Sequence, residues 1–203
     1  MAINTFVDLP SMKEAKTLAD LTSIEQDLRT AREFAELYLG EYGKPQYQRN
    51  LPDALMVATI IRYARSFKGG IRLPLPPAED FLTKEQTTEH QYFLNMRDKY
   101  IAHSVNAFEE NQPVARYWVE RVDTEGITAI ECMHARIVGL SERDVRGIIE
   151  LADAWLKYVQ QKLREEKAKL LEIVRGMPLE KILAGRRAPL NPDTSQPHVR
   201  RKS

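Results

Sequence analysis

Residues 50–70, with the sequence NLPDALMVATIIRYARSFKGG, form a run that is apolar on nearly every side when wound into a helix. Pro52 lies where a first helical turn tolerates a proline, and the Gly-Gly pair at 69–70 is a stop signal. A helix that is apolar all round between residues 55 and 61 needs cover from several sides. The segment therefore predicts a buried middle helix and, around it, a bundle of further helices.

Helical spacing is also present before and after this segment. Near the N-terminus the capping-box spacing occurs at Ser11 and again at Thr22, which leaves open one long helix or two helices joined near residue 22. After the proline-rich stretch at 71–77, which is extended rather than helical, Thr83 with Gln86 predicts the start of a helix. We expect this third main helix to run to about residue 104.

A change of pattern follows that helix. The segment at about 114–137 alternates, is rich in Val, Ile, Tyr, Trp and Thr, and has DTEG at its centre, which predicts a small β-hairpin. Its Tyr117 and Trp118 could stack on nucleic-acid bases, whereas packing within the hairpin or contact with a second subunit is the alternative. Ser141 then begins the last long helix, expected at about 141–174.

These elements predict a mainly all-α fold with a β-hairpin after the third main helix, in a single domain over residues 1–184. The tail at 185–203 is expected to be disordered and basic. Residues 186–203 have five basic groups against one acidic group, a net charge of +4, so the other residues carry −3 of the total of +1. The body of the protein is therefore not a general basic surface for nucleic acid.

Several classes of protein are disfavoured by the residue types. Cys132 is the single cysteine, so no internal disulfide forms, and a reducing cytoplasmic location is expected. No leader sequence and no apolar run of about 18 residues is present, so we expect no membrane association. No His/Cys cluster at metal-binding spacing and no phosphate-binding glycine loop occurs, so no metal and no cofactor is expected.

The stretch RDKYIAHS, residues 97–104, brings an Arg, an Asp and a His close together in the sequence. Positions six apart in a straight α-helix differ by about 120° around the axis and by about 9 Å along it. Arg97 and His103 would then cooperate only if the helix distorts before His103, or if a second copy of the chain completes the site. The structural alternative is a His that interacts with the carbonyls at a helix end, beside a solvated Arg97–Asp98 group.

The residues around this stretch resemble a known family. RDKYIAH has the pattern of HEPN domains, an Arg followed after four to six residues by a His, and Asp98 is of a type common after that Arg. The pairing of IRYARSFKGGIR with LNMRDKYIAHS some 25 residues later, and then a hairpin-like segment, is similar to the abortive-infection subgroup of HEPN proteins. The resemblance covers roughly residues 50–150.

This resemblance implies an up-and-down helical bundle that forms a homodimer, with catalytic Arg97 and His103 of both chains meeting in a cleft at the interface. The implied activity is metal-independent RNA cleavage, in which the 2′-OH attacks the adjacent phosphate and leaves a cyclic phosphate and a 5′-OH. Asp98 would orient Arg97 or His103, and Ser104 would donate a hydrogen bond to phosphate. Phage defence or toxin–antitoxin biology would be the context, with RNA and an antitoxin or other protein as partners.

Two other interpretations remain open. The first is a non-catalytic HEPN module that binds RNA, a nucleotide or a protein partner, and the second is a structural helical dimer. Arg62, Arg65 and Lys99 are candidate phosphate or RNA contacts, and for the two arginines an ion-paired surface role is the alternative. His90 lies on the same helical face as Arg97, where we expect a solvated side chain or a part of a basic cleft.

Overall fold

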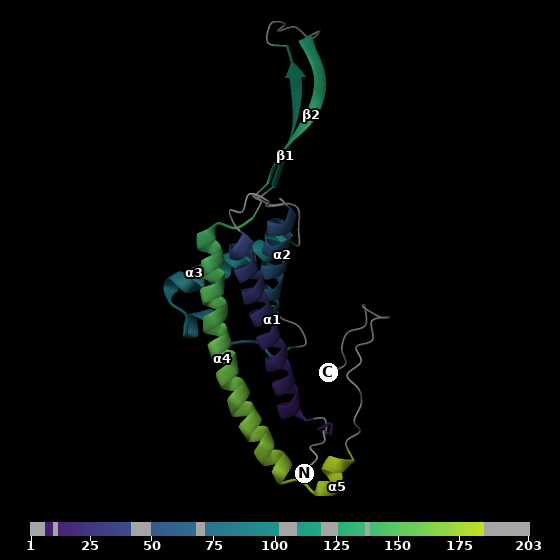
Figure 1. Cartoon of the computed structure of the whole chain (residues 1–203), viewed down its shortest axis with the longest axis vertical. Coiled ribbons are helices and arrows are strands. Elements are labelled where there is room, and N and C mark those ends of the chain that lie inside the picture. The colour runs from purple at the N-terminus through teal and green to yellow at the C-terminus, as the bar shows by residue number, and fades with distance from the viewer. Residues whose placement is uncertain are drawn as a thin grey trace.

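The computed structural model describes residues 7–9, 12–41, 50–67, 72–101, 109–118, 126–136 and 139–184 (Figure 1). As predicted, the fold is mainly helical, with one antiparallel β-hairpin after the third main helix. The elements are α1 (Lys13–Glu41), α2 (Asn50–Arg65), the short 3-10 helix η1 (Ala78–Asp80), α3 (Lys84–Met96), the π-helical turn η2 (Arg97–Ile101), β1 (Glu109–Tyr117), β2 (Ile127–Arg136), α4 (Glu142–Arg175) and α5 (Leu179–Leu183).

The longest helices, α1 and α4, lie side by side and run in opposite directions, and α2 packs against α1 (Figure 1). The N-terminal segment forms one continuous helix from Lys13 rather than two. Thr22 does not start a new helix, because its hydroxyl donates a hydrogen bond to the carbonyl of Leu18 one turn earlier, at 2.8 Å. In this way α1 is long enough to pack along much of α4.

The predicted burial of the middle helix is confirmed. Met56, Ile60 and Tyr63 of α2 are fully buried, and no residue from 55 to 64 is exposed. Trp155 of α4 is also fully buried and contacts the rings of Phe67 and Phe81. The core therefore forms where α1, α2, α3 and α4 bring their apolar stripes together.

Two helix starts follow the predicted capping. The Thr83 hydroxyl accepts from the backbone N–H of Gln86 at 3.2 Å, while the Gln86 side chain accepts from the Thr83 N–H at 3.1 Å. Ser141 and Asp144 make the same reciprocal pair at the start of α4. Each box satisfies N–H groups that have no partner inside the helix, which fixes where α3 and α4 begin.

The hairpin begins earlier than predicted, at residue 109 instead of about 114. Residues 109–112 are polar and lack the apolar alternation that indicates a strand, but they pair with residues 133–136 in regular register. A ribbon with solvent on both faces needs no apolar alternation, because its backbone hydrogen bonds form whichever side chains they carry. The predicted tail at 185–203 lies outside the described residues, and none of the described helices is long and apolar enough to cross a membrane.

The chain between the hairpin and α4 is held by a tyrosine of α1. The hydroxyl of Tyr38 accepts from the backbone N–H of Leu140 at 2.9 Å and donates to the carbonyl of the same residue at 2.8 Å. Both residues are buried. Gly139, just before, has φ +83°, and a Cβ there would lie 2.5 Å from the Tyr38 hydroxyl oxygen. This close approach requires glycine at position 139.

Tyr38→Phe is expected to lower the free energy of unfolding by about 1–3 kcal/mol, because it leaves a buried N–H and a buried carbonyl without partners. The measurement is urea denaturation followed by circular dichroism. Tyr92→Phe removes a hydroxyl from an exposed ring and should change stability by less than about 0.5 kcal/mol. Equal effects of the two substitutions would show that the Tyr38 contact does not stabilise the fold.

Candidate functional site

The first half of the RDKYIAHS stretch forms a π-helical turn at the end of α3. The α-helical pattern stops at Met96, and residues Arg97–Ile101 continue as η2. π-helical turns are rare, and they occur mostly as single turns within α-helices, often at functional sites. The helix is thus distorted where sequence analysis places the candidate catalytic arginine.

Arg97 and Asp98 lie together on this turn. The Nη1 group of Arg97 donates to a carboxylate oxygen of Asp98 at 2.9 Å, and the Arg97 side chain is 41% exposed. The carboxylate uses one of the five N–H groups of a guanidinium, so this pair restrains the orientation of Arg97 without occupying its whole donor set. Lys99, a third candidate, is exposed on the same turn. His103 and Ser104 lie outside the described residues.

The π turn bears on the angle between Arg97 and a residue six positions later. An i→i+5 turn contains more residues than an α-helical turn, so successive side chains are separated by less than 100°. For positions six apart, less rotation per residue increases the expected separation of about 120° instead of closing it. A regular turn of this kind therefore does not bring positions six apart onto one face, but the described turn ends at Ile101 and His103 lies outside the described residues.

Arg62 and Arg65, predicted as candidate phosphate contacts, form ion pairs with Asp27 of α1. The distances from Asp27 oxygens are 2.9 Å to Arg62 and 3.5 Å to Arg65, and Arg72 joins at 2.6 Å. The side chain of Asp27 is only 4% exposed. Of the two alternatives, the structure therefore shows ion-paired arginines, and it brings a third arginine to the same carboxylate.

The role of Asp27 was missed by sequence reasoning, although its position offered a clue. It lies on the buried stripe of α1 that also contains Ile24, Leu28 and Ala31. A carboxylate in an apolar stripe needs a cationic or hydrogen-bonding partner, since an isolated buried charge costs several kcal/mol. The pattern indicates that a partner exists, but it does not indicate which of the distant arginines provides it.

His90 is neither solvated nor part of a basic cleft, so both expectations for it are wrong. The ring is buried, and its Nδ1 atom lies 2.7 Å from the hydroxyl oxygen of Tyr63. Burial raises the pKa of the Tyr63 phenol far above its usual value, so this hydroxyl keeps its proton. The pair shares a hydrogen bond within the aromatic core and connects α2 to α3.

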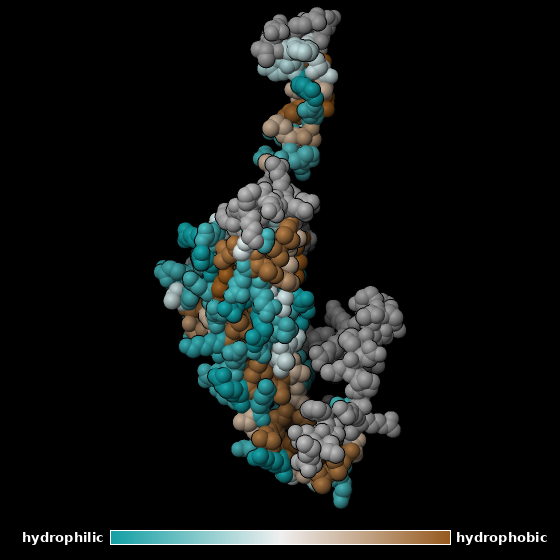
Figure 2. Space-filling view, in the orientation of Figure 1, coloured by the Kyte–Doolittle hydropathy of each residue, from teal (hydrophilic) through white to brown (hydrophobic). Residues whose placement is uncertain are grey.

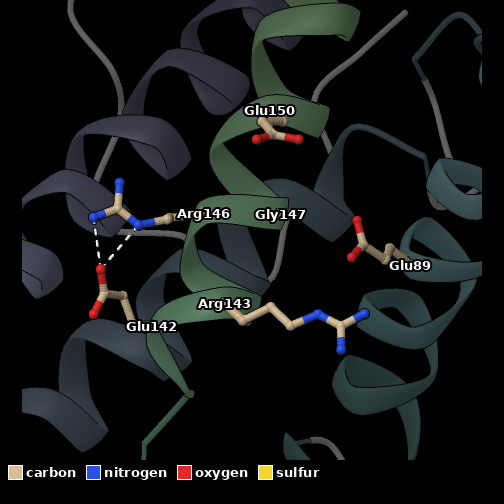
Figure 3. A pocket seen from close by; sticks show the side chains of 6 residues that line it. All are labelled: Glu89, Glu142, Arg143, Arg146, Gly147 and Glu150. Carbon is tan, nitrogen blue, oxygen red and sulfur yellow. Dashed lines mark hydrogen bonds and ion pairs between the residues drawn. The ribbon is translucent and has the colours of Figure 1, made fainter.

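A surface hollow of 570 Å³ lies between α3 and the first turns of α4 (Figure 3). Its lining residues are Glu89, Glu142, Arg143, Arg146, Gly147 and Glu150. Arg146 already binds the carboxylate of Glu142 at 2.6 Å, so the remaining charge includes two carboxylates and one guanidinium. This lining repels phosphate more than it attracts it, and Arg97 is not among the lining residues.

Comparisons with models of known families, with curated proteins and with solved structures find no match for this chain. Among the described residues, no three His, Cys, Asp or Glu side chains are grouped to hold a metal ion. The described part of the candidate site is the Arg97–Asp98 pair on the π turn, and the candidates His103 and Ser104 lie outside the described residues.

Asp27→Asn is expected to lower the free energy of unfolding by about 2–3 kcal/mol. Removing one partner of a fully buried ion pair lowers the free energy of unfolding by about 3–5 kcal/mol, and the partial exposure of the arginines reduces that cost. Chemical denaturation measures the change. Asp153→Asn is the matched control, because Asp153 also binds an arginine, Arg32 at 2.9 Å, but is 51% exposed. For the control, the free energy of unfolding should fall by less than about 1 kcal/mol. If the two variants lose the same amount, the buried ion pairs of Asp27 do not stabilise the fold.

Proposed function

We propose that this protein is a metal-independent endoribonuclease in which Arg97 and His103 act together across a homodimer interface. The observation that carries the proposal is the π-helical turn at Arg97–Ile101, which coincides with the Arg…His stretch. It is supported by the half-exposed guanidinium of Arg97, which Asp98 holds at 2.9 Å. The resemblance of the surrounding sequence to abortive-infection HEPN proteins gives the reaction class.

The proposed reaction uses the substrate's own 2′-OH as the nucleophile. His103 accepts the 2′-OH proton while the oxygen attacks the adjacent phosphorus atom, a role suited to a side chain that titrates near neutral pH. The P–O5′ bond breaks as the 5′ oxygen takes up a proton from water and leaves as a hydroxyl, and His103 afterwards returns the proton that it accepted to the solvent. The products are a 2′,3′-cyclic phosphate and a 5′-OH end, and DNA is excluded because it has no 2′-OH.

Arg97 stabilises the charge that develops on the phosphate oxygens in the transition state. A guanidinium offers two parallel N–H groups to a phosphate, and such charge-assisted bonds are short and strong. Asp98 is a positioning residue in this scheme, and Ser104 and Lys99 are further phosphate contacts. We further propose a cytoplasmic location and a role in phage defence or as the toxin of a pair, with an antitoxin protein as partner.

The test is incubation of the purified protein with single-stranded RNA in excess EDTA. We expect cleavage that leaves cyclic phosphate ends, and a decrease of at least about 100-fold in rate for Arg97→Ala and for His103→Ala. Replacing the ribose at the cleaved position by 2′-deoxyribose should abolish cleavage there. Product ends are identified by mass spectrometry.

Arg29→Ala is the matched control for the arginine. Arg29 is 46% exposed and binds Glu25 at 2.8 Å, so it resembles Arg97 in exposure and pairing but lies on α1. This variant should cleave at the wild-type rate. If wild type and His103→Ala show the same background, the nuclease proposal is lost, and RNA retention without turnover would identify a binding module instead.

A further inference from the structure

Three arginine side chains converge on the buried carboxylate of Asp27. Arg62 Nη1 and Arg65 Nε lie 2.9 Å and 3.5 Å from Asp27 oxygens, and Arg72 Nη1 lies 2.6 Å away. The side chain of Asp27 is 4% exposed, whereas the side chains of the three arginines are 40%, 47% and 29% exposed. The carboxylate therefore lies on the inner side, and the guanidinium groups lie between it and the solvent. We call Arg62, Arg65 and Arg72 the arginine cluster.

Ion pairing does not neutralise the arginine cluster. Within the described part of the chain, Asp27 is the only carboxylate that forms an ion pair with these arginines. Asp20, on the same face of α1, is also buried, and its carboxylate accepts a hydrogen bond from the backbone N–H of Leu73 at 3.1 Å. With Asp20 included, three cations face two carboxylates, so the cluster keeps a surplus positive charge.

The end of α2 explains two of these arginines but not the third. Arg62 and Arg65 lie in the last turn of α2, where the carbonyl groups of the helix end favour cations. Arg72 lies outside that helix, and its Nη1 shares the Oδ2 atom of Asp27 with the Nε of Arg65. Two cations that share one carboxylate oxygen repel each other. An anion bound on the solvent side would relieve this repulsion.

The arginine cluster also retains hydrogen-bond donors. A guanidinium has five N–H groups, and the hydrogen bonds to Asp27 use one group of Arg62 and one of Arg72. Arg65 is the most exposed of the three and lies at the longest distance from the carboxylate. Donors on partly exposed side chains can bind the oxygens of an anion that approaches from the solvent. Such charge-assisted hydrogen bonds from guanidinium to phosphate are short and strong.

The surface at the level of Asp27 suits a charged ligand. Figure 2 shows largely hydrophilic surface over the middle of the helical body and apolar surface nearer its two ends. The middle of α1 lies within this part of the body (Figure 1), and Asp27 is midway along α1 by residue number. The cluster therefore lies at a level where polar side chains, rather than an apolar area, meet the solvent.

We infer that the arginine cluster is a binding site for a phosphate group, separate from the candidate site at Arg97. Donors from three side chains suit a phosphate better than a carboxylate, because a phosphate has more acceptor oxygens and they do not lie in one plane. The phosphate belongs either to a free phosphomonoester, such as a nucleotide, or to the phosphodiester backbone of RNA. The site does not depend on the proposed nuclease, since none of its residues takes part in that reaction.

The experiment is isothermal titration calorimetry of the full chain at one fixed ionic strength, because salt weakens exposed charge interactions. The probes are inorganic phosphate, a nucleoside 5′-monophosphate, a 2′-O-methyl RNA oligonucleotide and citrate. The 2′-O-methyl RNA has phosphodiesters but no free 2′-OH, so the reaction proposed above cannot cleave it. Citrate provides carboxylates in place of phosphate oxygens.

Arg65→Gln is the test variant, because Arg65 is the arginine of the cluster that is farthest from Asp27. Arg32→Gln is the matched control. Arg32 is 39% exposed but lies between two carboxylates, Glu36 at 3.0 Å and Asp153 at 2.9 Å, so it carries no surplus charge. Far-UV circular dichroism shows whether each variant is folded. If Arg65→Gln unfolds, Arg65→Lys replaces it, since it keeps the charge but lacks the paired N–H groups.

We expect saturable binding of phosphate, at least about fivefold weaker binding for Arg65→Gln, and binding within about twofold of wild type for Arg32→Gln. Arg97→Ala should also bind phosphate like the wild type, because it alters the other candidate site. The probe that binds most tightly identifies the phosphate as a phosphomonoester or as the RNA backbone.

Four results would overturn the inference. The first is that no phosphate-containing probe binds, and the second is that Arg65→Gln binds like the wild type or weakens no more than Arg32→Gln. The third is that citrate binds as tightly as phosphate, because a general attraction of anions would explain it. The fourth is loss of phosphate binding in Arg97→Ala, which would assign the phosphate to the candidate site instead.

Discussion

The buried carboxylate of Asp27 is the constraint on which the arrangement of the helices depends. It is 4% exposed in the middle of α1 and lies within 3.5 Å of three arginines. A charge in that position is tolerated only when cations compensate it, so α2 and the segment that begins at Arg72 have to approach α1 at this level. Asp20, two turns earlier on the same face, adds a hydrogen bond from the Leu73 backbone N–H at 3.1 Å. Polar contacts thereby set the positions of elements that the apolar core alone would leave free to slide.

The packing of the helices also determines which side chains are available to the candidate site. Arg62 and Arg65 are engaged by Asp27, and His90 is engaged by Tyr63 inside the core, so these side chains support the fold. Arg97 differs, because its carboxylate partner is its neighbour Asp98 and its guanidinium remains partly exposed on a π turn. A short local pair of this kind contributes little to stability and is therefore better explained by orientation of the guanidinium than by support of the fold.

Much of the fold could be predicted from local patterns. The apolar run of α2, the capping boxes at Thr83 and Ser141, and the alternation between residues 114 and 137 each gave the right element, because each depends on neighbouring residues. The start of β1 was predicted too late, since its polar residues pair through the backbone. For the site, the stretch RDKYIAHS was found by its residue types, but the π turn was not, because helical spacing assumes 100° per residue.

The sequence by itself determined which segments become helices, where two of them are capped, that a hairpin follows the third main helix, and which side chains are candidates for chemistry. Only the tertiary structure decided that Asp27 meets arginines 35 and 45 positions away, and that His90 is buried against Tyr63. It also decided that the hairpin stands apart from the helices (Figure 1), with the side chains of Ile130 and Met133 exposed. The physical reason is the distance along the sequence over which each signal acts. Periodicity depends on neighbouring residues and shows which face of an element needs a partner, whereas the identity of that partner follows from how all the elements pack together.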